Sequence, residues 1–149
     1  MPDGQNQGPD IAAGVATTPP LSRERILATV DAALEARTAG QDVAHFFAPG
    51  AMFRIAGEPS LYGDFPAGPG DAVSTVAELM QRVNFDSCKR IDAIVEGNRA
   101  ACRWQIDFSI DGGPAATTEV GDLWTFDEEG RVVDLVQFVD SALLVRMLA

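Results

Sequence analysis

Apolar residues recur along this chain with two different spacings, and the change between them separates the predicted helices from the predicted strands. Apolar residues that recur every three or four positions form one stripe of an amphipathic helix. Ser22, Asp42 and Asp71 each precede such a run as an N-cap. Gly40 ends the first run, and Pro49-Gly50 ends the second. The segments with this spacing are 23–39, 43–48, 72–83 and 141–148.

Alternation of apolar and polar residues marks the strands, because neighbouring side chains of a strand point to opposite faces. The clearest example is the run in which Trp104 and Ile106 alternate with Gln105 and Asp107. Short turn sequences rich in glycine join the long strands as hairpins. The predicted strands are 51–56, 85–96, 99–111, 115–127 and 132–139.

Two segments show neither spacing. Residues 1–20 are rich in Gly, Pro, Asp, Gln and Thr, which predicts a disordered tail and leaves residues 21–149 as one domain. Residues 57–70, GEPSLYGDFPAGPG, predict a loop whose length is typical of functional loops. The order of elements predicts an α+β fold: a cone-shaped barrel in which three N-terminal helices pack on a curved, mostly antiparallel sheet, with a short C-terminal helix.

Charge and cysteine content restrict the partners. The formal net charge of −11 would repel phosphate backbones and anionic lipid headgroups, which argues against nucleic-acid and membrane partners. The N-terminus lacks the cationic start and apolar stretch of a signal peptide, so we expect a cytoplasmic protein with free thiols at Cys88 and Cys102. One histidine and two separated cysteines cannot build an ordinary zinc site, and we predict neither a metal nor a cofactor.

One carboxylate falls on a strand face that otherwise carries large aromatic side chains. Asp122 shares this face with Trp124 and Phe126, in a hairpin that spans residues 117–140. Burying a charged carboxylate is costly unless the group is paired, hydrogen-bonded or protonated. Two interpretations stay open: a pocket acid with a perturbed pKa, or a structural aspartate that hydrogen-bonds to a neighbouring strand end or helix cap.

Two segments resemble the nuclear transport factor 2-like superfamily, in its SnoaL-like branch of ketosteroid isomerases, polyketide cyclases and limonene-epoxide hydrolases. They are FFAPGAMF at 46–53 and DLWTFDEEGRVVDLVQFVD at 122–140, and the element order over 22–148 is also similar. The resemblance implies a conical pocket for an apolar small molecule and usually a homodimer. It implies no single activity, because the fold hosts many chemistries and non-catalytic members.

The resemblance assigns candidate catalytic residues one position at a time. Against ketosteroid isomerase, Asp122 matches the aspartic acid that is kept protonated to stabilise an oxyanion. Ile55 stands where the general base belongs, and Ala33 stands where the tyrosine belongs. Because isoleucine cannot abstract a proton, the resemblance does not imply isomerase activity of that type.

A second comparison within the superfamily adds two aspartates. Against limonene-epoxide hydrolase, Asp140 matches one catalytic aspartate and Asp107 matches the other. Gln105 stands where the arginine belongs, and Phe53 and Ile55 replace residues that hold the water. A hydrolytic water would therefore have lost most of its positioning partners.

Each candidate also has a structural alternative. Asp140 is equally a helix N-cap, and Asp107 and Gln105 belong either to a pocket wall or to a solvated or dimer-facing sheet surface. The predicted ligand-binding residues are Phe47, Phe53, Ile55, Tyr62, Gln105, Trp124 and Gln137. Three functions stay open: an isomerase, cyclase or hydrolase acting on an apolar cyclic substrate with Asp122 as acid or hydrogen-bond donor, a non-catalytic binding protein, and a dimeric scaffold with a closed core.

Overall fold

The computed structural model describes residues 21–149, so the tail predicted at 1–20 lies outside the described residues. Within 21–149, no helix has both the length and the apolar character needed to cross a membrane. The elements in chain order are α2 (Arg23–Thr38), η2 (Ala44–Phe46), β1 (Phe47–Ile55), η3 (Pro59–Tyr62), β2 (Gly70–Asp71), α3 (Ala72–Arg82), β3 (Val83–Glu96), β4 (Arg99–Ile110), β5 (Ala116–Phe126), β6 (Val132–Phe138) and α4 (Ser141–Leu148).

The described strands form one six-stranded sheet in the order β2-β1-β6-β5-β4-β3. Strands β3 to β6 follow one another as an antiparallel meander, whereas β1 pairs in parallel with β6 and places Phe53 opposite Leu135. The α+β class is therefore confirmed. The sheet is mixed and open, with β2 and β3 at its edges, which is consistent with the predicted cone although the barrel is not closed.

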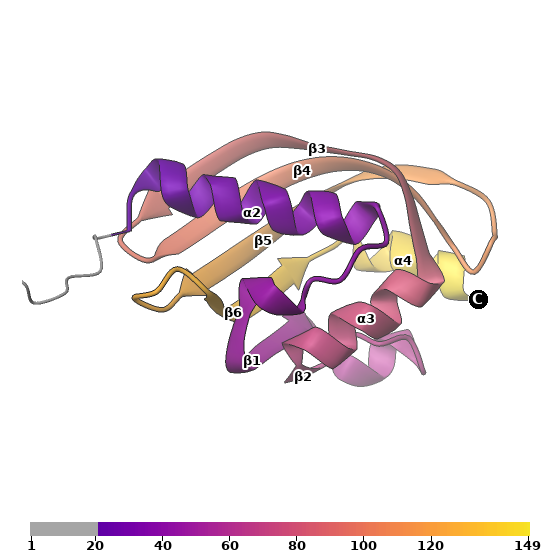
Figure 1. The fold of residues 1–149 in the computed structure, drawn as a ribbon. Helices are drawn as coiled ribbons and strands as arrows, with labels where there is room; N and C mark the ends of the chain where they lie inside the picture. Colours follow the sequence, from indigo (N-terminus) through magenta and orange to yellow (C-terminus); the bar gives the residue numbers. More distant parts are fainter. Residues whose placement is uncertain (1–20) are drawn as a thin grey trace, which may run out of the picture.

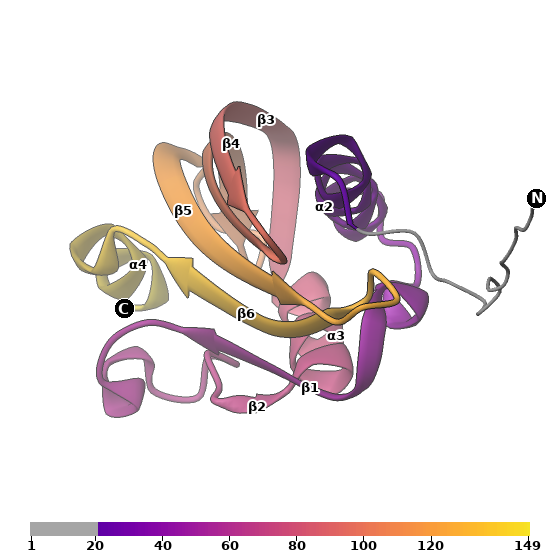
Figure 2. The same cartoon turned by 90° about the vertical axis from the view of Figure 1, so that its left-hand side faces the viewer.

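The sheet is strongly curved, and α2 and α3 lie on its concave side (Figures 1 and 2). Helix α2 packs against β3, α3 packs against β1, and α4 follows β6 and packs against η3. Strand β3 contains two register shifts against β4. Irregularities of this kind increase the local bend of a strand, which helps β3 to arch over α2.

One predicted helix is absent from the described chain. The segment 43–48 forms only the single 3₁₀ turn η2, and strand β1 already begins at Phe47. Pro49 and Gly50 therefore do not end a helix. They lie exposed inside β1, where the pairing with β6 shifts its register and tolerates a residue without an N–H group. Two α-helices and a 3₁₀ turn thus replace the three N-terminal helices of the prediction.

The helix starts agree with the caps that the sequence indicates. The side chain of Ser22 accepts a hydrogen bond from the backbone N–H of Arg25, and the side chain of Asp71 accepts one from Ser74, both at 3.0 Å. Each cap satisfies a backbone donor that has no partner inside the helix. The predicted starts of α2 and α3 are therefore confirmed.

Candidate functional site

A cavity lies between the concave face of the sheet, α2 and α4. Its volume is about 70 Å³. Much of its wall is apolar and includes Leu34, Ile55, Phe85, Ile106, Val120 and Leu144. Concave sites with mostly apolar walls and a few polar groups are typical of small-molecule binding, although this one is smaller than the usual ligand pocket. The core is therefore not completely filled.

Asp122 is the carboxylate that reaches this cavity. It lies in β5, its residue surface is only 3% exposed, and Trp104 Nε1 on β4 donates a hydrogen bond of 2.9 Å to its Oδ2. Its Oδ1 is equally buried and has no hydrogen-bond partner among the described residues. One carboxylate oxygen is thus held in place, while the other is left without a hydrogen-bond partner.

Arg37 and Gln137 complete a polar cluster with Asp122, which we call the Arg37–Asp122–Gln137 cluster. Gln137 on β6 lies directly opposite Asp122 on β5, and all three residues line the cavity. Arg37, in the last turn of α2, is 8% exposed and donates through Nη1 to Gln137 Oε1 at 3.4 Å. Its guanidinium also lies over the ring of Phe85, with 5.5 Å between guanidinium carbon and ring centre.

Arg37 is not among the site residues predicted from the sequence, although its position carries a usable indication. Val30, Leu34 and Arg37 follow one another at spacings of four and three, so Arg37 continues the apolar stripe of α2. A charged residue on a buried stripe needs a partner or a functional reason. Its place beside Asp122 depends on how α2 docks on the sheet, which the local pattern does not show.

Burial dominates the electrostatics of the cluster. It raises the pKa of Asp122 from 3.8 to about 6, while Trp124, Trp104, the positive charge of Arg37 and Gln137 act in the opposite direction. The indole N–H of Trp124 lies beside the carboxylate and forms no hydrogen bond of ordinary geometry within 21–149. Burial also lowers the pKa of Arg37 to about 10, which leaves it cationic at neutral pH. A group that exchanges its proton near neutrality therefore lies beside a permanent positive charge.

The two cysteines are free thiols, as expected. Burial raises the pKa of Cys88 to about 11 and that of Cys102 to about 12, so both are protonated at neutral pH. A protonated thiol is a poor nucleophile. Among the described residues, no group of three His, Cys, Asp or Glu side chains is arranged to bind a metal ion.

The three predicted catalytic aspartates have separate surroundings. Asp140 lines the cavity beside α4, and its Oδ1 accepts a hydrogen bond of 3.0 Å from the N–H of Leu143, so it also caps that helix. Asp107 accepts hydrogen bonds from the hydroxyls of Ser87 and Thr117, which lower its pKa. These partners lie on the convex face of the sheet, so Asp107 is not brought together with Asp122 and Asp140.

The predicted ligand-binding residues divide in the same way. Ile55 and Gln137 line the cavity. Phe47, Phe53 and Trp124 are buried in the core outside its wall. Gln105 is exposed on the convex face, because Trp104 and Ile106 on either side of it point inward. Period-two alternation therefore excludes both Gln105 and Asp107 from the cavity.

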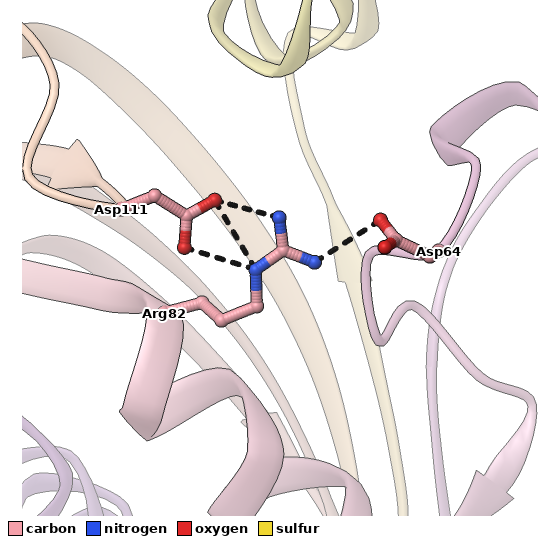
Figure 3. A network of polar contacts seen from close by, with 3 residues as sticks. All are labelled: Asp64, Arg82 and Asp111. Carbon is pink, nitrogen blue, oxygen red and sulfur yellow. Dashed lines mark hydrogen bonds and ion pairs between the residues drawn. The ribbon is translucent and has the colours of Figure 1, made fainter.

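The loop predicted at 57–70 contributes one side chain to the cavity wall. That side chain is Phe65, whereas the predicted Tyr62 is 4% exposed and packs in the core beside the cavity. Arg82 at the end of α3 holds the loop in place (Figure 3). It donates to Asp111 from Nη2 at 2.6 Å and from Nε at 3.0 Å, and to Asp64 from Nη1 at 3.3 Å. Its guanidinium also lies 5.3 Å from the ring centre of Phe65.

We expect Arg82→Gln to loosen this loop without unfolding the domain. The substitution removes the bidentate contact to Asp111 and the stacking on Phe65, so amide hydrogen exchange over 58–67 should become at least several-fold faster. Exchange in α2 should stay unchanged. Asp64→Asn is the matched control, because the side chain of Asp64 is 96% exposed and its ion pair is weak. Equal exchange in the two variants would contradict this role of Arg82.

Solved structures with the same fold give the comparison with known proteins. A protein of unknown function from Burkholderia pseudomallei K96243, described as NTF2-like, is 17% identical and covers 87% of this chain and 99% of its own, with a TM-score of 0.67. A protein from Jannaschia sp. CCS1 that has been assigned as a SnoaL-like polyketide cyclase is 16% identical, covers 86% of this chain and 95% of its own, and has a TM-score of 0.65.

A third match is TerC, which was crystallised with polyporic acid. It is 13% identical, covers 83% of this chain and 98% of its own, and has a TM-score of 0.66. No family model and no curated protein matches the sequence. At these identities the likeness concerns the fold, and it confirms the fold that the sequence resemblance implied.

Proposed function

We propose, from the nuclear transport factor 2-like fold that this chain adopts, that the protein binds an apolar cyclic small molecule and converts it by acid–base chemistry at Asp122. The reaction would be of the isomerase or cyclase type. One observation carries the proposal: Asp122 belongs to the wall of an apolar cavity, has a buried Oδ1 without a partner, and has a pKa of about 6. A group with a pKa close to the working pH is well suited to general acid–base catalysis.

The cluster assigns a separate task to each side chain. Asp122 gives a proton to, or takes one from, the reacting atom of the substrate through Oδ1. Arg37 and Gln137 lie where they stabilise the negative charge that develops on an oxygen during such a transfer. The hydrogen bond from Trp104 to Oδ2 fixes the carboxylate, which keeps Oδ1 directed at the reacting atom. The apolar wall excludes water and so keeps the proton between enzyme and substrate.

Two matched structures support a small-molecule ligand. One has been assigned as a SnoaL-like polyketide cyclase, and the other was crystallised with polyporic acid. A non-catalytic binding protein is the second candidate, and it is favoured by Ile55, an aliphatic residue in the cavity wall at the position of the isomerase base. The homodimer and the cytoplasmic location stay predictions.

We expect Asp122→Asn to lower turnover at least about 100-fold for any substrate found among cyclic ketones, polyketides and epoxides. Asparagine has the same shape but neither gives nor takes the proton. The wild-type rate should change as the pH passes through about 6, and this change should disappear in the variant. The assays are steady-state kinetics against pH and native mass spectrometry of the purified protein.

Asp107→Asn is the matched control, since it makes the same chemical change on the convex face of the same sheet. Its turnover should equal that of the wild type. Undiminished turnover in Asp122→Asn would exclude Asp122 as the acid or base. Retention of an apolar ligand without any conversion would favour the binding protein instead.

A further inference from the structure

The guanidinium of Arg37 is buried with most of its donors unused. It carries five N–H groups, and within 21–149 it makes one long hydrogen bond of 3.4 Å, from Nη1 to Gln137. Nε is fully buried and has no partner, and Nη2 donates to no described residue. Arg37 also forms no ion pair with a described carboxylate. The Nε–Nη2 edge, which is the side that binds carboxylates, therefore has no acceptor among the described residues.

Two partly buried arginines of this chain do have a carboxylate at their Nε–Nη2 edge. Arg90 places its Nε and Nη2 on the two carboxylate oxygens of Asp31 at 2.8 and 2.9 Å. Arg82 uses the same two atoms on Asp111. Arg37 has greater need of such a partner, because a buried charge that lacks one is strongly unfavourable. Arg37 is one of the residues that line the cavity.

The surroundings of Arg37 tolerate the positive charge but do not satisfy its donors. The charge lies in the last turn of α2, where the negative end of the helix dipole favours a cation. The ring of Phe85 accepts the guanidinium face, and Asp122 attracts it without direct contact. None of these interactions supplies an acceptor in the plane of the Nε–Nη2 edge, where hydrogen bonds form.

We infer that the ligand of this cavity carries a carboxylate, which Arg37 binds through its Nε–Nη2 edge while the apolar remainder of the ligand fills the cavity. The inference rests on the proposed function and narrows its substrate class to apolar organic acids. Planar anions with two oxygens match the fork of a guanidinium, and such bidentate contacts are strong in a water-poor site.

The other polar groups of the cavity are compatible with an anion. The thiol of Cys88 on β3 is neutral, and Asp140 is turned to the N–H of Leu143. Asp122 is the one buried carboxylate nearby among the described residues, and an anion beside it favours its protonated form. Protonated Asp122 would then donate a hydrogen bond from Oδ1 to the ligand instead of repelling it.

The test compares two probes that differ in charge, 2-naphthoate and 2-naphthamide, by isothermal titration calorimetry at pH 6.5. Their flat apolar rings are the same, and the amide keeps a neutral carbonyl oxygen. We expect the wild-type protein to bind the acid at least roughly tenfold more tightly than the amide, the range of a hydrogen bond to a charged group. In Arg37→Met this preference should vanish, while the affinity for 2-naphthamide stays within about twofold of the wild-type value.

Two further variants secure the interpretation. Arg90→Met removes a paired arginine outside the cavity and should keep the full preference for the acid. Arg37→Gln removes the charge but leaves a polar side chain, and it should lose the preference in the same way as Arg37→Met. Circular dichroism and the indole ¹H–¹⁵N signal of Trp104 show whether each variant is folded around the cavity.

The outcomes separate the inference from the proposed function. Equal affinity for both probes in the wild type would overturn the inference and leave an apolar binding site. A preference for 2-naphthoate that persists without Arg37 would also overturn it, because the anion would then bind elsewhere. If neither probe binds at millimolar concentration, the cavity does not hold this class of molecule, and the proposed function fails together with the inference.

Discussion

Asp122→Asn is expected to be more stable than the wild-type protein at pH 7.5, by up to about 3 kcal/mol. The pKa of Asp122 is about 6 in the folded protein and 3.8 as the ordinary value. Between these values the folded protein keeps a proton that the unfolded chain releases, so stability falls as the pH rises, by about 1.4 kcal/mol for each pH unit. Asparagine has no proton to lose, and its side-chain oxygen still accepts the hydrogen bond from Trp104.

The pH dependence separates this effect from an ordinary change in packing. Urea denaturation of both proteins between pH 4 and 7.5 should show nearly equal stability at pH 4, where Asp122 is protonated in the folded wild type. The gap should open between pH 4 and about 6 and stay constant above that. A difference of the same size at every pH would contradict a buried, perturbed carboxyl group.

Asp107→Asn is the control, because the pKa of Asp107 is shifted in the opposite direction to that of Asp122. Hydrogen bonds from Ser87 and Thr117 lower the pKa of Asp107, so its carboxylate gains folding stability as the pH rises through its titration. This variant should not gain stability at neutral pH. If Asp122→Asn loses turnover while it gains stability, the wild-type protein retains a destabilising group for its function.

Gly68→Ala is expected to destabilise the fold by about 3 kcal/mol or more, although it adds one methyl group. Gly68 has a φ of 72°, and a Cβ at this position would lie 2.4 Å from the carbonyl oxygen of Phe53 and 3.0 Å from the Cα of Arg54. Those atoms belong to β1, which pairs with β6 on one side and β2 on the other. The strand cannot move away without breaking one of these pairings.

Gly50→Ala separates the clash from the backbone strain. Gly50 has a similar φ of 78°, but a Cβ there would meet no atom within 4 Å. It should show only the cost of a left-handed conformation, about 1–2 kcal/mol. Urea denaturation of both variants measures the difference. Equal losses would mean that β1 yields to the added methyl group, in contrast to the rigid pairing described above.

The features that were predicted correctly from the sequence depend on neighbouring residues. Ser22 and Asp71 cap helices because a cap needs only the backbone three positions ahead. The aromatic face of β5 follows from alternation alone, and alternation is sufficient to place Asp122 on the same buried face as Trp124. The boundaries of β4 and α4 were predicted to within one or two residues for the same reason.

The errors concern contacts between distant segments. Pro49-Gly50 indicated the end of a helix, whereas parallel pairing with β6 makes the segment a strand. Arg37 meets Gln137 only because α2, which packs against β3, brings its last turn to β6. Asp107 was proposed by resemblance, although the alternation of β4 already placed it on the face opposite Trp104. Where resemblance and alternation disagree, local periodicity is the better guide to the orientation of a side chain.

The parallel pairing of β1 with β6 also sets an order of events during folding. Strands β3 to β6 are sequence neighbours joined by short turns, and such local contacts form early. Strand β1 can pair with β6 only after β6 has been synthesised, because β6 lies near the C-terminus. This pairing also closes a long loop, which costs more chain entropy than the closing of a short turn. Ile55 and Gln137, which face each other across this last pairing, both line the cavity. A ligand that touches both strands therefore binds only chains in which this final closure has occurred, and its binding energy would slow their reopening.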